Sequence, residues 1–278
     1  MANIIDGKLV ASVCRQSIKE EIAEYKARTG KEVGLAVVLV GDDPASAIYV
    51  RNKIKACEEV GVKSYAYKYD ADMSEEDLVA LVEKLNADDN VHGILVQLPL
   101  PKHINEERIV ALVSEKKDVD GFSEVSIGRL VQGKPCFRSC TPAGVMKLLE
   151  YYNIDVAGKN AVVIGRSNNV GKPMAMMLLE KNATVTICHS RTKNIAEITK
   201  QADILVSAVG RAHFVTADRV KEGAVVIDIG MNKLDGKTVG DVDFAAVEPK
   251  ASYITPVPGG VGPMTITMLM ANTLQVVK

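Results

Sequence analysis

The stretch NAVVIGRSNNVGKP (160–173) decides the class of fold. The segment 160–165 is short, and after Asn160 its residues are continuously apolar, which is typical of a buried parallel strand. Gly165 and Gly171 then frame a turn, and the amphipathic segment at 171–181 is expected to be a helix. A strand, a glycine-rich turn and a helix in this order can hold a phosphate group over a helix N-terminus in doubly wound α/β domains.

This turn departs from the usual dinucleotide-binding pattern. It reads G-x-S-x-x-x-G, so one glycine is replaced and the spacing is longer by one residue. The next expected strand, 184–188, is followed by Ser190 and Arg191 rather than by the acid that holds the ribose of NAD. Ser190, Arg191 and Arg166 could hold a 2′-phosphate, which favours NADP over NAD. The alternatives are that the glycines only satisfy the backbone geometry of a turn after a strand, and that the basic residues only form a solvated loop.

Strand-length and helix-length segments alternate along most of the chain. Strands are expected at 34–40, 63–69, 91–97, 160–165, 184–188, 203–210 and 224–230. Helices are expected at 8–29, 45–60, 74–86, from Thr141-Pro142 to Tyr152, at 171–181, and from Met264 to the end. Residues 99–139 are less regular and mark the expected domain junction. The sequence therefore predicts an α/β protein of two three-layer lobes with a cleft between them, the second lobe being a Rossmann-type dinucleotide-binding domain.

Length and composition further limit the number of domains and the kinds of partner that this protein can have. The 278 residues suffice for about two domains. A net charge of −1 argues against nucleic acid or an anionic membrane as the main partner. No apolar run approaches the ~20 residues of a membrane-spanning helix, and the N-terminus lacks the pattern of a secretory signal. Five scattered cysteines and four histidines predict reduced thiols in a cytoplasmic protein without a metal site.

Four polar residues of the first half are candidates for chemistry. Tyr49 and Lys53 are four residues apart and share one helical face, beside an apolar stripe that would partly desolvate the lysine. Gln97 ends the third expected strand, at the carboxyl edge where parallel sheets bind ligands. Asp120 lies in the junction loop. The alternatives are a lysine that extends into solvent and an acid that only forms a turn.

Ordered sequence blocks resemble the bifunctional methylenetetrahydrofolate dehydrogenase/cyclohydrolase family from near the N-terminus to the last helix. The blocks are DDPASAIYVRNK (42–53), GILVQLPLP (93–101), KDVDGF (117–122), CTPAG (140–144), GRSNNVGKP (165–173), CHSRT (188–192) and TPVPGGVGPMTITML (255–269). Two departures remove no chemical group: Ser139 stands where relatives often have proline, and Met231 where a smaller aliphatic residue is common.

The resemblance implies two activities and their residues. The enzyme would oxidise 5,10-methylenetetrahydrofolate with NADP and hydrolyse the methenyl product to 10-formyltetrahydrofolate. The implied catalytic residues are Lys53, Gln97, Tyr49 and Asp120. Folate would also contact Val96, Leu98, Pro258, Gly259, Gly260, Val261 and Gly262, and the cofactor would contact Gly165, Arg166, Ser167, Ser190, Arg191 and Met231.

The resemblance also implies domain limits and assembly. It predicts a folate-binding catalytic domain at 1–138, completed by a C-terminal helix at 262–278, and an NAD(P)-binding domain at 139–261. It further implies a cytoplasmic homodimer in one-carbon metabolism that serves purine biosynthesis. Two alternatives remain open at this point: a dehydrogenase that has lost the hydrolytic step, and a non-catalytic module that only binds the nucleotide.

Overall fold

The computed structural model describes residues 1–278, apart from the side chain of Ala45. The chain divides into two compact units. We call residues 1–12 and 139–265 the six-stranded unit, and residues 13–138 and 266–278 the three-stranded unit, after their main sheets. The boundaries between the units fall inside the first helix, α1 (Gly7–Thr29), and the last helix, α10 (Val261–Gln275).

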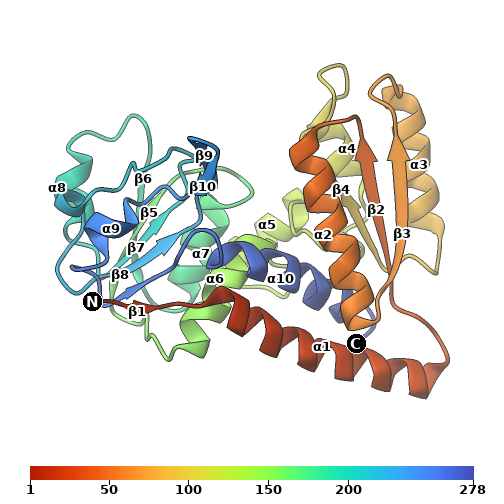
Figure 1. The fold of residues 1–278 in the computed structure, drawn as a ribbon. Helices are drawn as coiled ribbons and strands as arrows, with labels where there is room; N and C mark the ends of the chain where they lie inside the picture. Colours follow the sequence, from red (N-terminus) through yellow and green to blue (C-terminus); the bar gives the residue numbers. More distant parts are fainter. The chain divides into compact units, whose positions relative to one another are not determined.

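The three-stranded unit contains a parallel sheet of order β3-β2-β4 (Figure 1). Its strands are β2 (Gly34–Val40), β3 (Lys63–Tyr69) and β4 (Gly93–Val96). Its further helices are α2 (Pro44–Val60), α3 (Glu75–Ala87), α4 (Glu106–Leu112) and α5 (Glu124–Val131). The first two strands match the predicted limits, whereas β4 is shorter than expected.

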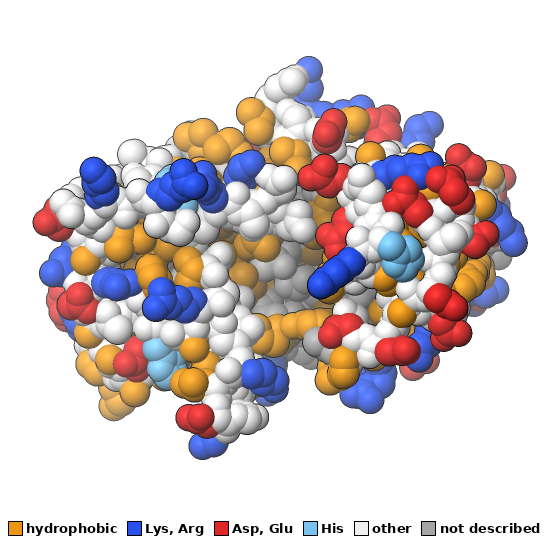
Figure 2. Space-filling view, turned by 90° about the horizontal axis from the view of Figure 1, so that it is seen from above, with side chains coloured by type: hydrophobic (Ala, Val, Ile, Leu, Met, Phe, Trp, Pro, Cys, Tyr) orange, Lys and Arg blue, Asp and Glu red, His pale blue; other side chains and the backbone are white. Residues whose placement is uncertain are grey.

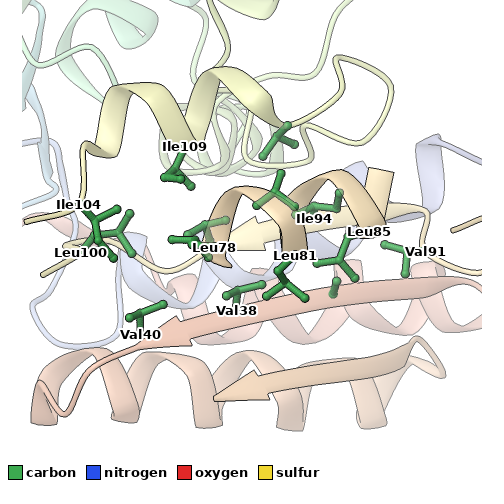
Figure 3. Packing of buried hydrophobic residues seen from close by; sticks show 14 residues of the cluster. Val38, Val40, Leu78, Leu81, Leu85, Val91, Ile94, Leu100, Ile104 and Ile109 are labelled. Atoms are coloured by element: carbon green, nitrogen blue, oxygen red, sulfur yellow. The ribbon is translucent and has the colours of Figure 1, made fainter. Parts of the chain in front are cut away.

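An apolar cluster joins this sheet to α3 and α4. Figure 3 shows Val38 and Val40 of β2 facing Leu78 of α3 and Ile109 of α4. The alternate residues of β2 point to the opposite face of the sheet, where α2 packs against β2 and β3. β2 is buried over its whole length because helices cover both faces, as its uninterrupted apolar sequence predicts.

Local signals explain where several helices begin and end. The side chain of Ser74 accepts a hydrogen bond from the Asp77 N–H and so caps α3, as predicted. Gly30 and Gly61 follow α1 and α2 with positive φ angles of 68° and 85°, which a glycine adopts without strain.

Two expectations for the middle of the chain were wrong. Residues 99–139, expected to be irregular, contain α4 and α5, which are capped by the side chains of Asn105 and Ser123. The predicted N-cap Thr141 lies inside α6 (Cys140–Tyr151), and Ser139 is the N-cap residue. The Ser139 hydroxyl instead donates to the Asn169 carbonyl, a tertiary contact that local sequence does not reveal.

The six-stranded unit has a parallel sheet of order β1-β11-β8-β7-β5-β6. Its strands are β1 (Asn3–Ile4), β5 (Asn160–Ile164), β6 (Thr184–Cys188), β7 (Ile204–Ser207), β8 (Val225–Asp228) and β11 (Tyr253–Ile254). A hairpin of β9 (Asn232–Leu234) and β10 (Lys237–Val239) is separate from this sheet. The strand pairs β1/β11 and β9/β10 were not predicted, because they are only two or three residues long.

Helices cover both faces of the six-stranded sheet. They are α6, α7 (Gly171–Glu180), α8 (Ile195–Thr199), α9 (Phe244–Val247) and a short 3₁₀ turn at Ala217–Arg219. α7 packs against β5 and β6, while apolar residues of α8 and α9 join the cluster that includes Val162, Leu205 and Val226. The predicted class of fold, with layered α/β units and parallel sheets, is therefore confirmed. α10 begins three residues before the expected Met264.

The surface reflects the balanced composition. Figure 2 shows acidic and basic side chains interspersed with apolar ones on the face in view. Among the described residues, no helix is long and apolar enough to span a membrane.

One buried acid gives the six-stranded unit a pH-dependent stability. Burial raises the pKa of Asp228 to about 7, and the nearby Asp241 carboxylate adds repulsion. Because the pKa is higher in the folded state than the ~3.9 of an unfolded chain, Asp228 stabilises the fold most at low pH. This contribution is lost as the pH rises through the interval between the two values.

We expect Asp228→Asn to remove this pH dependence. The difference in free energy of unfolding between the wild type and the variant should change by up to about 1.4 kcal/mol per pH unit over that interval. Denaturant unfolding at a series of pH values measures it. Asp235→Asn, at an exposed turn residue, should keep the wild-type slope, and a wild-type slope in Asp228→Asn as well would contradict the assignment.

Candidate functional site

A lysine–amide pair lies on the three-stranded unit. The Lys53 Nζ donates a hydrogen bond of 3.0 Å to the Gln97 Oε1, and both side chains are half-buried. Lys53 is in the third turn of α2, which starts at Pro44 and is capped by Asp43. Gln97 directly follows β4, and its N–H continues the sheet by donating to the Val38 carbonyl. The two residues that were predicted from helix spacing and strand end are thus brought together.

The amide of Gln97 has a fixed orientation. Its Nε2 donates to the Leu98 carbonyl at 2.6 Å, so its oxygen is the atom that faces the lysine. The hydrogen bond in turn fixes the direction in which the Lys53 amine can act. A primary amine held by an oriented amide acceptor can bind an oxygen-containing group or exchange a proton with one.

Tyr49 is one helical turn before Lys53. Its side chain is 37% exposed, and burial of the rest raises the pKa of its hydroxyl, so the phenol is neutral near pH 7. A neutral ring with an accessible part can stack on a flat heterocycle.

Asp120 lies in the loop between α4 and α5 and is half-buried. The acid that shapes this turn is Asp118, which is buried and accepts hydrogen bonds from Phe122 N, Ser123 N and Ser126 Oγ. Sequence analysis missed Asp118, although a carboxylate five residues before Ser123 at a helix start is a usable signal. Asp118 therefore contributes to the turn for which Asp120 had been considered.

A buried amide of the last helix supports the same loop. The Asn272 Nδ2 donates to the Val119 carbonyl at 2.7 Å and to the Arg138 carbonyl at 2.9 Å. Val119 is itself buried, packed on Gly93 of β4 where any larger residue would collide with it. Asn272 was not predicted, because its partners are more than 130 residues away in sequence.

The glycine turn of the six-stranded unit follows β5. Gly165 has φ 131°, and a Cβ there would overlap the Ala208 carbonyl oxygen. A Cβ at Gly171 would overlap the Gly165 carbonyl oxygen, so α7 can only start this close to the strand with glycine. These are the tight turn and the close helix–strand packing that dinucleotide-binding sites require. Ser167 replaces the middle glycine, and its hydroxyl accepts from the N–H groups of Val170 and Gly171.

Basic residues meet at the carboxyl edges of two neighbouring strands. Ile164 of β5 is in register with Cys188 of β6, so the turns that begin at Gly165 and His189 are adjacent. Arg166, Ser190 and Arg191 in these turns are all exposed. Two guanidinium groups and a hydroxyl at one sheet edge form a suitable site for a phosphate monoester.

The remaining predicted residues lie elsewhere on the six-stranded unit or beside Gln97. Met231, which follows β8, is 52% exposed at the same sheet edge. The turn at 258–262 leads into α10, and Gly260 donates to the Pro256 carbonyl. Gly259 has φ 110°, whereas a Cβ at Gly262 would meet open space within the described chain. Beside Gln97, Val96 is buried and Leu98 is half-buried.

No group of three described His, Cys, Asp or Glu residues is arranged to hold a metal ion.

The fold and these two groups of residues define a dinucleotide-dependent α/β enzyme. The family model of the tetrahydrofolate dehydrogenase/cyclohydrolase catalytic domain matches residues 5–120, and the model of its NAD(P)-binding domain matches residues 139–278. The chain belongs to this tetrahydrofolate dehydrogenase/cyclohydrolase family, which confirms the resemblance.

Relatives match over nearly the whole chain. The bifunctional protein FolD of Albidiferax ferrireducens is 58% identical, over 98% of this chain and 95% of its own. The crystal structure of the bifunctional enzyme FolD from Campylobacter jejuni has a TM-score of 0.98 at 50% identity and covers 100% of this chain and 99% of its own. The Trypanosoma brucei enzyme, solved with NADP cofactor and inhibitor, has a TM-score of 0.95 at 38% identity and covers 99% and 97%.

We expect Asn272→Ala to destabilise the three-stranded unit. The substitution removes one donor from two carbonyl oxygens, which costs on the order of 1–3 kcal/mol where such groups are buried. Thermal unfolding should show a lower midpoint for Asn272→Ala, while the exposed Gln275→Ala on the same helix should match the wild type. Equal midpoints for the two variants would show that Asn272 does not support the loop.

Proposed function

We propose that Lys53 and Gln97 form the hydrolytic centre of this folate enzyme. As a member of its family, the chain oxidises 5,10-methylenetetrahydrofolate to 5,10-methenyltetrahydrofolate with NADP and hydrolyses the product to 10-formyltetrahydrofolate. The observation that carries the proposal is the 3.0 Å hydrogen bond between the lysine amine and the oriented glutamine amide.

The hydrolytic step needs a proton acceptor. Methenyltetrahydrofolate is a cationic amidinium-like electrophile, and water attacks its one-carbon bridge. The new C–O bond forms as one water proton passes to the Lys53 amine, and this proton can return to a folate nitrogen as the C–N bond breaks. The remaining hydroxyl proton leaves to solvent as the formyl C=O bond forms. The Gln97 oxygen holds the amine in place throughout.

The other folate contacts follow from the predicted site. The Tyr49 ring stacks on the pterin or aminobenzoyl part, and Asp120 accepts hydrogen bonds from the pterin. The backbone at Val96 and Leu98 flanks Gln97, and the turn Pro258–Gly262 contributes close backbone approach. The open space at Gly262 supports this role, because packing within the chain does not require glycine there.

The oxidation depends on positioning. NADP, when bound, supplies the hydride acceptor. Gly165, Arg166 and Ser167 bind its phosphates, and Ser190 and Arg191 hold the 2′-phosphate. The exposed Met231 gives an apolar surface for the nicotinamide end. Hydride transfer then needs alignment of two bound molecules more than acid–base help.

We further propose the domain limits and setting given by the sequence. These limits give a folate-binding domain at 1–138, completed by 262–278, and an NAD(P)-binding domain at 139–261, whereas in the structure residues 1–12, with β1, and residues 262–265 belong to the six-stranded unit. All five cysteines are thiols, which suits a reducing cytoplasm. A 10-formyl product suits purine biosynthesis, which consumes one-carbon groups. For a homodimer, β6 is the natural contact, since it is an edge strand with Ile187 37% exposed and Leu179 of α7 54% exposed.

One assay separates the two enzyme hypotheses and the binding module. With methylenetetrahydrofolate and NADP, a bifunctional enzyme forms reduced cofactor and 10-formyltetrahydrofolate. A dehydrogenase that has lost hydrolysis accumulates methenyltetrahydrofolate. A module that only binds the nucleotide forms neither product.

Lys53→Met should abolish hydrolysis and leave the fold intact. Methionine keeps the length and apolar stem of lysine, so the loss of stability should stay within about 1.5 kcal/mol. Loss of a general base lowers rate by about 10²–10⁴, as followed by the methenyl absorbance. Dehydrogenase activity should fall less. Lys55→Met, at an exposed position of the same helix, is the control, and near wild-type hydrolysis by Lys53→Met would refute the mechanism.

Arg166→Ala combined with Arg191→Ala should weaken NADP far more than NAD. Only NADP carries the 2′-phosphate, and each lost charged hydrogen bond costs about 1.5–3 kcal/mol where solvent is excluded, less at an exposed edge. The KM values for both cofactors measure the difference. Lys193→Ala, an exposed cation of the same loop, controls for general charge. Equal losses with NAD and NADP would show that the arginines do not bind the 2′-phosphate.

A further inference from the structure

The carboxylate of Asp241 lies at the centre of a buried polar cluster in the six-stranded unit. Asp241 is 0% exposed and follows β10. Its Oδ2 accepts from Val209 N at 2.7 Å, Ser207 Oγ at 3.2 Å and Gly210 N at 3.3 Å. Its Oδ1 accepts from Arg211 N at 2.9 Å and Asn232 Nδ2 at 3.0 Å. Five donors around one side chain satisfy the hydrogen-bonding capacity of both its oxygens in the interior.

These donors belong to segments that border the proposed cofactor site. The loop at 208–211 follows β7 at the carboxyl edge of the sheet. The Ala208 carbonyl is the group that a Cβ at Gly165 would strike, so this loop forms one wall of the glycine turn. Asn232 begins β9 and comes directly after Met231. Asp241 therefore links the wall of the turn to the residue that borders the nicotinamide end.

A second acid fixes Asp241 itself. The Asp228 Oδ1 accepts from the N–H groups of Asp241 and Gly230, and its Oδ2 accepts from Val242 N, at 2.8–3.0 Å. A Cβ at Gly230 would overlap the Asp241 carboxylate, and one at Gly240 would overlap the Asp228 carboxylate. No residue larger than glycine therefore fits at 230 or 240, and the surrounding backbone holds the Asp241 carboxylate in its observed position.

The sheet topology shows which part of the cofactor this loop would meet. The chain runs from β5 to β6 on one side and then crosses to β7 on the other side, so the strand order reverses between β5 and β7. Dinucleotides bind across such a reversal, with the adenosine ribose at the end of the second strand. That strand is β6, and Ser190 and Arg191 lie in the turn that follows it. The loop after β7 therefore borders the other, nicotinamide half.

We propose that Asp241 is a positioning residue for hydride transfer. It holds the 208–211 loop and Met231 against the nicotinamide half of NADP without touching the cofactor. The proposal rests on the cofactor site proposed above. It predicts that a change at Asp241 affects NADP-dependent oxidation but spares hydrolysis, which needs no nucleotide and uses Lys53 of the other unit.

The first test replaces Asp241 with asparagine. Asp241→Asn keeps the size of the side chain but places an NH₂ group against N–H donors, so the loop must move. We expect the Kd for NADP to rise about ten- to a hundredfold. The inhibition constant of 2′,5′-ADP, which represents the adenosine half, should stay unchanged, and so should hydrolysis of methenyltetrahydrofolate.

A matched control and a milder variant keep the test decisive. Asp203→Asn removes a hydrogen-bonded acid at the amino end of the same strand β7, paired with Lys221, and should leave the Kd for NADP unchanged. Asn232→Ala removes one of the five donors and should raise the Kd by a smaller factor at an unchanged melting temperature. If Asp241→Asn does not fold, Asn232→Ala decides the question.

Two results would overturn the proposal. One is an unchanged Kd for NADP in Asn232→Ala together with parallel loss of both activities in Asp241→Asn, which indicates a purely structural acid. The other is an equal loss of affinity for NADP and 2′,5′-ADP, which contradicts a role at the nicotinamide half. Failure of the cofactor proposal is distinct, because Arg166→Ala combined with Arg191→Ala would then weaken NADP and NAD equally, whatever the result at Asp241.

Discussion

Parallel pairing of buried strands is the constraint on which both sites depend. In a parallel sheet all carboxyl ends meet at one edge, and a single residue after each strand is already in the loops at that edge. Gln97 stands after β4, Gly165 after β5, and Met231 just beyond β8. Helices cover both faces of each sheet, so this edge is where polar groups can be concentrated without being buried in the core. The polar groups that follow the strands are therefore held in position by the rigid sheet, and in the three-stranded unit helix α2 adds Lys53 to them.

Sequence was a good guide wherever the signal was local. The continuous apolar run of β2 predicted this strand to the residue, the limits of β6 were also predicted, and Gly30 and Gly61 marked the ends of their helices. Helix spacing and a strand end pointed to Lys53 and Gln97 separately, and the family resemblance implied their pairing. These patterns carry information because the helix and the strand each impose a fixed period on the side chains.

Where tertiary contacts decide, sequence was a poor guide. Thr141 looked like an N-cap, but Ser139 takes that place and uses its hydroxyl on Asn169 instead. Asp228 and Asp241 were not singled out, since nothing in a run such as VVIDIG or GDVD shows that the Asp241 N–H donates to the Asp228 carboxylate across 13 residues. The short helices α4 and α5 were missed for a related reason, as packing stabilises them more than propensity.

The buried acids show why a polar cluster can persist in an apolar sheet unit. A hydrophobic residue in place of Asp241 would leave backbone N–H groups at 209–211 without an acceptor, and each such group costs about as much as a lost hydrogen bond. The loop could regain acceptors only by turning toward solvent and away from the glycine turn. An anion in the core thus makes one loop conformation far more favourable than any other. The buried acids thus fix the loop conformation at the sheet edge, and the cost is the desolvation that raises the pKa of the neighbouring Asp228.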